Sequence, residues 1–432
     1  MHDAKITGKV QFLQIVRRYL LYGMIITIIF SRLNVNSLCM ILFTLTWIIE
    51  GNFKDKWRLL KNDKLFIAYG LYFLVQFVGM TQSDNLYSGW LGVEDKLGFL
   101  MLPMVFCSTP FLDVAMRRKV MTLFSISITI AAIYCLVIAG IQYSGTGNNE
   151  FFFYHQLVSP ISQHAVYFSV YTFIVFVFLI RENNSLLWKA KYRVFYISWI
   201  IFLLLFLVLL SSKMALLVVI LFLFYLLFRS GNKKIKRWQA VGGGILTILA
   251  ITAIMTTSNP VQKRFIDLKG SIELLKKEKY DAGYYFNGWQ FRLLLWRVTY
   301  EILMERHAWV TGVGSPRAQA ILQDKYLGLG LYGGDRNSDD HGYLKYNCHN
   351  QFLQTILQSG ILGLLFFSAW CYLLFKRAVP KKEPVLIWEL VMLICFFFIE
   401  SVCERQYGIP LCTLIPLMYL YTVNDKASPV SA

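Results

Sequence analysis

The sequence is short of charged residues and of polar stretches. Asp, Glu, Lys and Arg make up 16% of its 432 residues, whereas 56% are hydrophobic. So apolar a composition excludes a soluble globular domain of this size. The apolar residues come in blocks, and several blocks are long enough to cross a bilayer core, which takes about 20 residues as a helix. The composition therefore predicts an all-α, polytopic membrane protein.

Cysteine pairs and metal-binding patterns are also missing. None of the eight cysteines forms a C-x-x-C pair, and most lie in apolar runs, which excludes a zinc site and a disulfide framework. Cys348 stands beside His349, but without a second suitable partner nearby a packed thiol is favoured over a nucleophile. Asp339, Asp340 and His341 match no metal signature. We therefore predict no metal and no cofactor.

The chain lacks a cleavable signal peptide of the usual form. The first apolar run follows Arg17 and Arg18 without a small-residue cleavage site after it, so we expect it to be retained as the first span. The formal charge of +18 does not predict nucleic-acid binding. In a polytopic membrane protein, basic residues gather in cytoplasmic loops and set the orientation.

The apolar blocks predict about twelve membrane spans. They lie near residues 19–31, 35–49, 65–81, 97–111, 120–143, 160–180, 194–211, 214–228, 239–258, 350–375, 385–403 and 408–422. The first, second, fourth and eighth blocks are short for a full crossing. We expect these four to be tilted, extended by aromatic residues, or partly re-entrant.

The loop charges alternate along the chain. Lys and Arg cluster at 5–18, 54–64, 117–119, 181–193, 229–237 and 376–382. The loops after the third and fifth spans are acidic, with Asp84, Glu94, Asp95 and Glu150 against Lys96. This alternation predicts that both termini are cytoplasmic and that His349 lies on the opposite face.

One long polar segment interrupts the spans, from about Asn259 to Cys348. Residues 261–279 are charged with a helical period, Phe291 to Arg306 forms an amphipathic pattern, and Arg317 to Tyr326 fits a short helix. A structureless loop of this length is unusual, so we expect a small helical cap. The predicted organisation is a membrane domain at 1–258, a loop or cap at 259–348, and a second membrane part at 349–432.

Three residues are the main candidates for chemistry. His349 opens the tenth span and can serve as a general base, cap the helix, or donate to a phosphate. Arg292 lies at the start of the amphipathic loop helix, and its planar fork suits a diphosphate, although a solvated helix face is the plain alternative. Lys213 stands between two apolar runs, where a functional lysine and one that snorkels to the interface both remain open.

Further polar groups are predicted at the same membrane face. Glu400 and Glu404 are one helical turn apart at the end of the eleventh span, with Arg405 beside them. They orient a catalytic group or form an ion-paired helix end. Gln163 and His164 lie near the start of the sixth span. Basic groups, histidines and a carboxylate pair on one face suit a lipid-linked anionic substrate.

Four stretches resemble those of a known family. They are Leu210–Ala215, Arg292–Trp296 with Thr311–Gly314, His349–Leu353 with Gly360–Gly363, and Glu400–Gly408. The first resembles a Ser-Arg/Lys element, the second an Arg-x-x-x-Trp and Gly-Val-Gly element, and the third a His-Asn helix. In this order around one long loop, they resemble the O-antigen ligase and polymerase superfamily of bacterial membrane glycosyltransferases.

The resemblance implies a GT-C-like helical fold and a metal-independent, inverting transfer. The donor would be a glycan on undecaprenyl diphosphate, used at the periplasmic face of the inner membrane. Arg292 and Lys213 would stabilise the diphosphate, and His349 would activate or orient the acceptor hydroxyl. Lys213 departs from the arginine common at its position and lacks the fork. Asn350, Trp296, Gln163, His164, Glu400, Glu404 and Arg405 are further candidates for binding the diphosphate or the acceptor.

Several functions remain open at this point. A ligase joins the glycan to a lipid A core sugar, a polymerase joins repeat units on the same carrier, and a third variant glycosylates protein. We favour the ligase because one external loop dominates a layout of about twelve spans. A transporter of lipid-linked sugars is the alternative from another class, but the paired halves with broken helices that transporters often show are not evident. The expected partners are the lipid-linked donor, the acceptor and membrane lipids, without nucleic acid.

Overall fold

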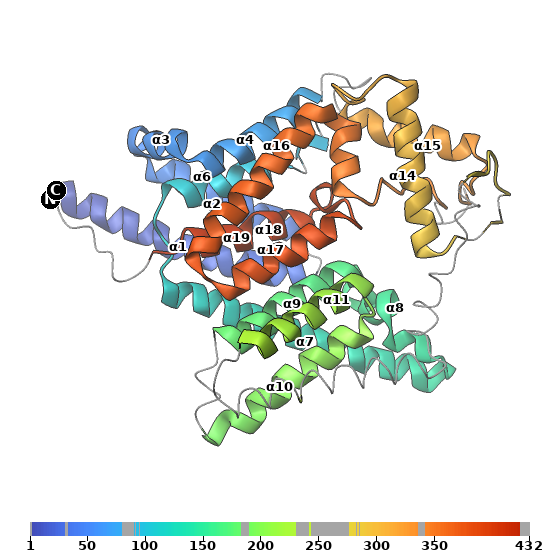
Figure 1. The fold of residues 1–432 in the computed structure, drawn as a ribbon. Helices are drawn as coiled ribbons and strands as arrows, with labels where there is room; N and C mark the ends of the chain where they lie inside the picture. Colours follow the sequence, from blue (N-terminus) through green and yellow to red (C-terminus); the bar gives the residue numbers. More distant parts are fainter. Residues whose placement is uncertain are drawn as a thin grey trace.

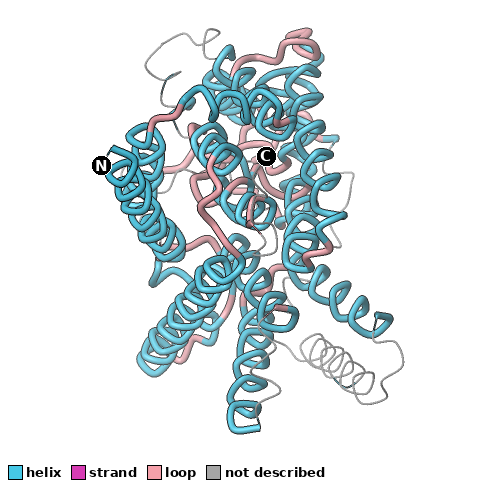
Figure 2. Tube along the Cα trace, turned by 90° about the vertical axis from the view of Figure 1, so that its left-hand side faces the viewer, coloured by secondary structure: helices cyan, strands magenta, loops and turns pink. Residues whose placement is uncertain are grey.

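The computed structural model describes residues 2–30, 33–79, 90, 92–94, 96–182, 190–229, 242, 276–281, 283–284, 286–335 and 342–423. Across these residues the regular structure is helical, apart from one isolated β-bridge between Asp113 and Val423 (Figure 2). The predicted all-α class is confirmed.

The helices follow the apolar blocks of the sequence. They are α1 (His2–Ile29), α2 (Leu33–Glu50), α3 (Phe53–Asn62), α4 (Lys64–Gly79), α6 (Gly98–Ser108), α7 (Val114–Thr146), α8 (Tyr154–Val158), α9 (Ala165–Arg181), α10 (Ala190–Leu209), α11 (Lys213–Arg229), α14 (Gly288–Glu305), α15 (Ser315–Gly328), α16 (Gln351–Lys381), α17 (Pro384–Phe397), α18 (Gly408–Cys412) and α19 (Leu414–Leu420). Short 3₁₀ turns are η2 (Asn149–Phe152), η3 (Ser159–Ile161) and η6 (Val402–Glu404). The predicted span at 239–258 lies, but for residue 242, outside the described residues.

The predicted count of about twelve spans is not confirmed. Among the described residues four helices are long and apolar enough to cross a membrane, namely those at α1, α7, α10 and α16. The number rises to six if two bent pairs each count as one span. One pair, α2 with α3, turns by 118° after Gly51 and Asn52, which both have a left-handed backbone. The predicted second block, 35–49, ends at this turn, and the basic stretch after it, expected as a loop, forms α3.

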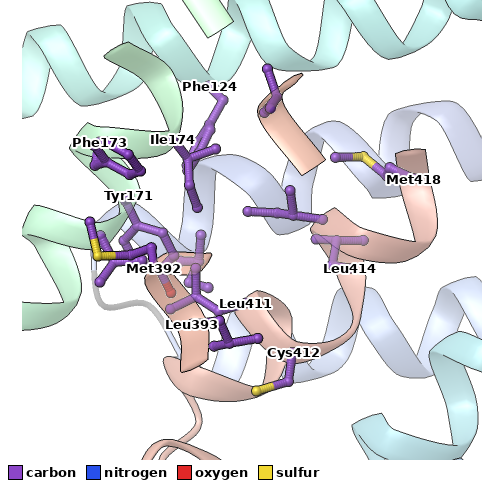
Figure 3. Packing of buried hydrophobic residues seen from close by; sticks show 14 of the residues in the cluster. Phe124, Tyr171, Phe173, Ile174, Met392, Leu393, Leu411, Cys412, Leu414 and Met418 are labelled. Atoms are coloured by element: carbon purple, nitrogen blue, oxygen red, sulfur yellow. The ribbon is translucent and has the colours of Figure 1, made fainter. Parts of the chain in front are cut away.

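Most of the helices pack around one large apolar core. α16 lies along α4, α1 packs against α2 and α7, and α9 contacts α7, α10, α11 and α17 (Figure 1). Every residue of α9 from Ala165 to Leu179 is buried, which identifies α9 as a central helix. Figure 3 shows side chains from α7, α9, α17 and α18 meeting in this core, among them Phe124, Tyr171, Leu393 and Leu411. Close packing of this kind stabilises helices that share an apolar surrounding.

The long polar segment contains a second apolar cluster. Leu294 and Leu295 of α14 pack with Leu322 and Tyr326 of α15 and with Leu357 of α16. Figure 1 shows α14 and α15 together at one edge of the molecule. The predicted helices near 291–306 and 317–326 are therefore present. Residues 261–275 of the predicted charged helix lie outside the described residues, and the periplasmic side remains a prediction.

Several basic residues from the loops predicted to be cytoplasmic are ion-paired. Arg17 and Lys56 both contact the carboxylate of Glu50, at 2.9 and 2.7 Å. Arg377 pairs with Asp63 at 2.8 Å. The pairs of Arg17 with Glu50 and of Arg377 with Asp63 join residues that are distant in sequence, so part of the basic charge stabilises the fold.

Candidate active site

His349 is held in place by its neighbour Asn350. The Asn350 side chain caps α16 by accepting from the backbone N–H of Leu353 at 3.0 Å, and its Nδ2 donates to the carbonyl of Phe398 at 3.2 Å. One side chain therefore joins the start of α16 to the turn that follows α17. His349 itself has a left-handed backbone with φ 44°, a strained conformation for a residue other than glycine.

This arrangement brings His349 to Glu400. Nδ1 of His349 lies 3.1 Å from Oε2 of Glu400, and the two side chains are 12% and 4% exposed. Glu400 lies beyond the end of α17. Burial alone would raise the pKa of its carboxyl, but its interactions with His349, His164 and Arg292 outweigh this and lower the pKa to about 2. Glu400 is therefore a fixed negative charge beside the imidazole.

Arg292 lies on the other side of the same turn. Its Nε donates to the carbonyl of Ile399 at 3.0 Å, and its Nη1 donates to the carbonyl of Gly288 at 2.8 Å. These two bonds fix the guanidinium plane next to Glu400. Arg405 is exposed and close enough for its charge, like that of Arg292, to act on His164 and Tyr346. Arg292 thus lies near Glu400, and Arg405 lies near His164 and Tyr346.

His164 belongs to the same cluster. It directly precedes α9, its ring lies 4.4 Å from that of His155, and its buried Nδ1 has no hydrogen-bond partner among the described residues. Burial lowers the pKa of His164 to about 4, since the opposing influence of Glu400 is smaller and His349, Arg405 and Arg292 add to the lowering. A predicted candidate from the sixth span is therefore brought next to candidates from the tenth and eleventh spans.

Two other candidates have structural partners of their own. Nε2 of Gln163, which is 6% exposed, donates to the carbonyls of Ile28 and Ile29 at 2.6 and 3.0 Å. Its amide nitrogen therefore satisfies the last carbonyls of α1. Oε1 of Glu404 lies 3.0 Å from Nζ of Lys96, rather than in a cluster shared with Glu400.

The predicted helical spacing of Glu400 and Glu404 is wrong. α17 ends at Phe397, and the chain continues through a bend into η6. The two carboxylates therefore do not lie one α-helical turn apart on a common face. Their partners differ accordingly: His349 for Glu400, and Lys96 for Glu404.

Lys213 and Trp296 lie on the elements predicted for them. Lys213 is the half-buried first residue of α11, and α11 packs against α9 and α17, the helices next to His164 and Glu400. Trp296 follows Arg292 by four residues on α14, and its ring lies 5.9 Å from that of Trp289. Its Nε1 is buried, and no hydrogen-bond partner for it lies in the part of the chain that the structure describes. The roles of both residues remain predictions.

Cys348 is a packed thiol, as predicted. It is fully buried, and its Sγ accepts from Oγ1 of Thr299 at 3.2 Å. Burial raises the pKa of this thiol to about 12. Because the thiolate is the nucleophilic form, Cys348 is unsuited to attack a substrate near neutral pH.

The glycine motifs interlock with one another. Gly360 breaks α16 with φ 62° and ψ −162°. The freed carbonyls of Leu357 and Gln358 accept from the backbone N–H groups of Val313 and Gly314 at 2.8 and 3.0 Å. A Cβ on Gly312 would lie 2.4 Å from the carbonyl carbon of Gln358, and one on Gly360 would lie 2.1 Å from the oxygen of Val310. The Gly-Val-Gly and Gly-Ile-Leu-Gly elements are thus two sides of one backbone contact.

A comparison with known protein families matches the part of the chain that contains Arg292 and His349. Residues 198–368 match a family model described as O-antigen ligase. This part of the chain is similar to the O-antigen ligase family domain. The predicted family resemblance is confirmed, and members of the family are glycosyltransferase-like membrane enzymes. No curated protein matches the chain.

The O-antigen ligase match covers part of the cluster. It includes the candidates Lys213, Arg292, Trp296, His349 and Asn350. Glu400 and Arg405 follow the matched region, and His164 precedes it, yet the fold brings these residues to His349. The cluster is therefore completed from outside the matched region.

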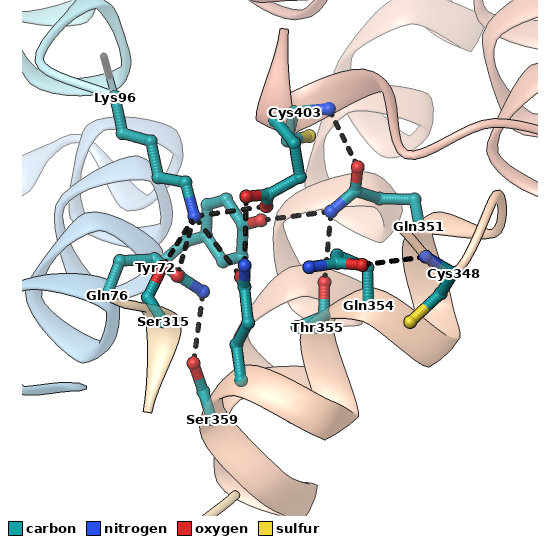
Figure 4. Close-up of polar contacts among 12 residues, drawn as sticks. Tyr72, Gln76, Lys96, Ser315, Cys348, Gln351, Gln354, Thr355, Ser359 and Cys403 are labelled. Carbon is teal, nitrogen blue, oxygen red and sulfur yellow. Dashed lines mark hydrogen bonds and ion pairs between the residues drawn. The ribbon is translucent and has the colours of Figure 1, made fainter. Parts of the chain in front are cut away.

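Sequence reasoning missed a buried polar network next to this cluster. Figure 4 shows Lys96, Gln76 and Ser315 meeting near Gln351 and Gln354 of α16. Lys96 also contacts a third glutamine of α16, Gln358. All three glutamines are buried. Their spacing of three and four residues places them on one helix face. That polar stripe inside an apolar span was the available signal.

Proposed function

We propose that this chain is a membrane glycosyltransferase of the O-antigen ligase type. It would transfer a glycan from undecaprenyl diphosphate to a sugar hydroxyl of lipid A core, at the periplasmic face of the bacterial inner membrane. The observation that carries this proposal is the contact between His349 and Glu400, with Arg292 fixed against the same turn. A family match that covers Arg292 and His349 supports it.

In the proposed reaction His349 acts as the general base. Glu400 faces Nδ1, which leaves Nε2 to accept the proton of the acceptor hydroxyl. As that proton leaves, the hydroxyl oxygen bonds to the anomeric carbon and the bond from this carbon to the diphosphate oxygen breaks. Attack opposite the leaving group inverts the anomeric centre. The negative charge of Glu400 stabilises the imidazolium that forms.

The leaving diphosphate requires positive charge. Arg292 is held by two backbone carbonyls, so its guanidinium would be oriented before substrate binds. Arg405 is exposed beside the same cluster, and Lys213 begins a helix that packs against α9 and α17. We assign the diphosphate to these cations and propose a metal-independent reaction.

The test is a transfer assay with purified protein in detergent and EDTA present. The reaction contains undecaprenyl diphosphate-linked glycan and lipid A core, and the product is separated by size. Transfer to lipid A core that disappears in His349→Ala is the expected result. A glycan that instead lengthens on its own carrier would replace the ligase by a polymerase.

The cation assignments need separate variants. Folded Arg292→Ala and Lys213→Ala are each expected to lose most of the transfer. A folded variant with full transfer would remove that residue from the diphosphate site. If the wild-type protein forms neither product, a lipid-flipping assay in vesicles tests the transporter instead.

A further inference from the structure

Lys96 is a buried charge outside the proposed catalytic groups. It is 3% exposed and precedes α6. Its Nζ lies 3.0 Å from Oε1 of Glu404, 2.9 Å from Oε1 of Gln76, 3.2 Å from Oε1 of Gln358 and 3.3 Å from Oγ of Ser315 (Figure 4). These partners come from α4, α15, α16 and the turn after α17. One ammonium group therefore joins four separate parts of the fold.

The amide groups around Lys96 have a consistent orientation. Gln358 accepts from Lys96 through Oε1 and donates through Nε2 to Oε2 of Glu404 at 2.9 Å. Gln76 accepts from Lys96 and donates through Nε2 to Oγ of Ser359 at 3.0 Å. An ammonium has three donors and no acceptor, and these partners satisfy them all. The space around Nζ is thus filled by protein groups.

This network reaches the proposed catalytic pair through one short turn. Besides the contacts of Arg292 and Asn350 described above, Oε1 of Gln351 accepts from the N–H of Cys403 at 2.7 Å. Those three bonds are between a side chain and the backbone of the turn. The contact of Lys96 with Glu404 adds an ion pair between two side chains.

We propose that Lys96 is a positioning residue for the His349–Glu400 pair. Its ion pair with Glu404 fixes the turn at 398–404, so that Glu400 stays within reach of His349. The same ammonium holds Ser315, at the start of α15, and Gln358, next to the break in α16, against α4. Loss of the Lys96 charge leaves the half-buried Glu404 carboxylate, whose side chain is 15% exposed, without its cation, which disfavours the observed position of the turn. The effect of Lys96 on catalysis rests on the proposed function, whereas its effect on the position of the turn at 398–404 does not.

The test combines kinetics with hydrogen exchange. Lys96→Met, Glu404→Gln, the double variant and Lys96→Arg are prepared in detergent. Lys96→Met is expected to lower kcat by about 100-fold, the effect of a displacement of roughly 1 Å, with KM for the lipid-linked donor changed less than about threefold. Amides 399–405 are expected to exchange faster. Lys325→Met, which removes an ion pair of α15 with Glu305, is the matched control and leaves both quantities unchanged.

The double variant separates positioning from general loss of structure. Because Lys96→Met, Glu404→Gln has no uncompensated carboxylate, it is expected to recover kcat by about tenfold over Lys96→Met alone. Lys96→Arg is expected to recover part of the activity.

Three outcomes overturn the proposal. The first is unchanged exchange of amides 399–405 in Lys96→Met. The second is a raised KM with unchanged kcat, which would place Lys96 at the substrate. The third is a double variant less active than Lys96→Met. If the wild type transfers no glycan at all, the exchange measurement still decides whether Lys96 fixes the turn.

Discussion

Replacing Glu400 by Gln tests the proposed catalytic pair most directly. The change removes one negative charge and preserves the size of the side chain. In the proposed mechanism His349 becomes positively charged as it accepts the hydroxyl proton, and Glu400 at 3.1 Å stabilises that charge. The variant is therefore expected to lose rate while donor and acceptor still bind.

The size of the effect follows from the geometry. Unit charges about 4 Å apart interact by about 4 kcal/mol at an effective dielectric constant of 20. The Glu400 side chain is 4% exposed, so salt screens this interaction little. About 1.4 kcal/mol corresponds to a factor of ten in rate. We therefore expect kcat to fall on the order of 10³-fold, with KM for the donor nearly unchanged.

The assay is single-turnover transfer to lipid A core at saturating donor. Glu305→Gln is the control, because Glu305 forms an exposed ion pair with Lys325, and such pairs contribute little. Size-exclusion profiles and melting temperatures establish that both variants are folded. A folded Glu400→Gln protein that keeps more than about a tenth of the wild-type kcat would refute the charge-stabilisation argument.

Three further results are expected. Arg292→Lys keeps the charge but loses the planar fork that bonds the carbonyls of both Ile399 and Gly288. We therefore expect kcat to fall at least tenfold, which corresponds to about 1.4 kcal/mol in activation free energy. Steady-state kinetics measures this, and an unchanged kcat contradicts the prediction. Gly360→Ala should destabilise the protein by about 3 kcal/mol or more, because the residue has a left-handed backbone and a Cβ would overlap the oxygen of Val310. Gly145→Ala, with open space at its Cβ, is the control in a thermal melt, and equal melting temperatures would refute the argument. The pKa of His164 is lowered from 6.5 to about 4, so the unfolded chain binds a proton in that interval that the folded protein does not, and stability should fall as pH drops from 6.5 toward 4. His164→Asn should flatten this part of the melting-temperature profile, and an identical slope would exclude His164 as its cause.

Much of the fold was predictable because it depends on local properties. An apolar run forms a helix in a membrane wherever it lies in the chain, so helices such as α4, α7, α9, α10, α11 and α16 match predicted blocks, whereas the basic α3 and the short α8 lie outside them. The amphipathic pattern at 291–306 predicted α14 for the same reason. The helix α3 was not predicted. The predicted block at 35–49 ended where α2 ends, but the basic stretch after it, expected as a loop, folds into α3 at 118° to α2.

For the candidate site too, the sequence predicted some features and not others. His349, Arg292, Glu400 and His164 were chosen from residue type and position, and the structure brings all four together. Their functional roles remain predictions. The glycine motifs were recognised in the sequence, but their reason was not. It lies in a backbone contact between residues 310–314 and 357–361.

The sequence alone determined the helical class, the alternation of loop charge and the family domain, because each is encoded in neighbouring residues. Tertiary structure decided which polar groups meet. Glu400 and Glu404 are equivalent in sequence terms, yet one contacts His349 and the other Lys96. Gln163 was predicted as a site residue on the same grounds as His164, but its amide nitrogen bonds the carbonyl of Ile28 at the end of α1. The partner of a side chain is set by how helices distant in sequence pack together, and no single stretch of the sequence determines that packing.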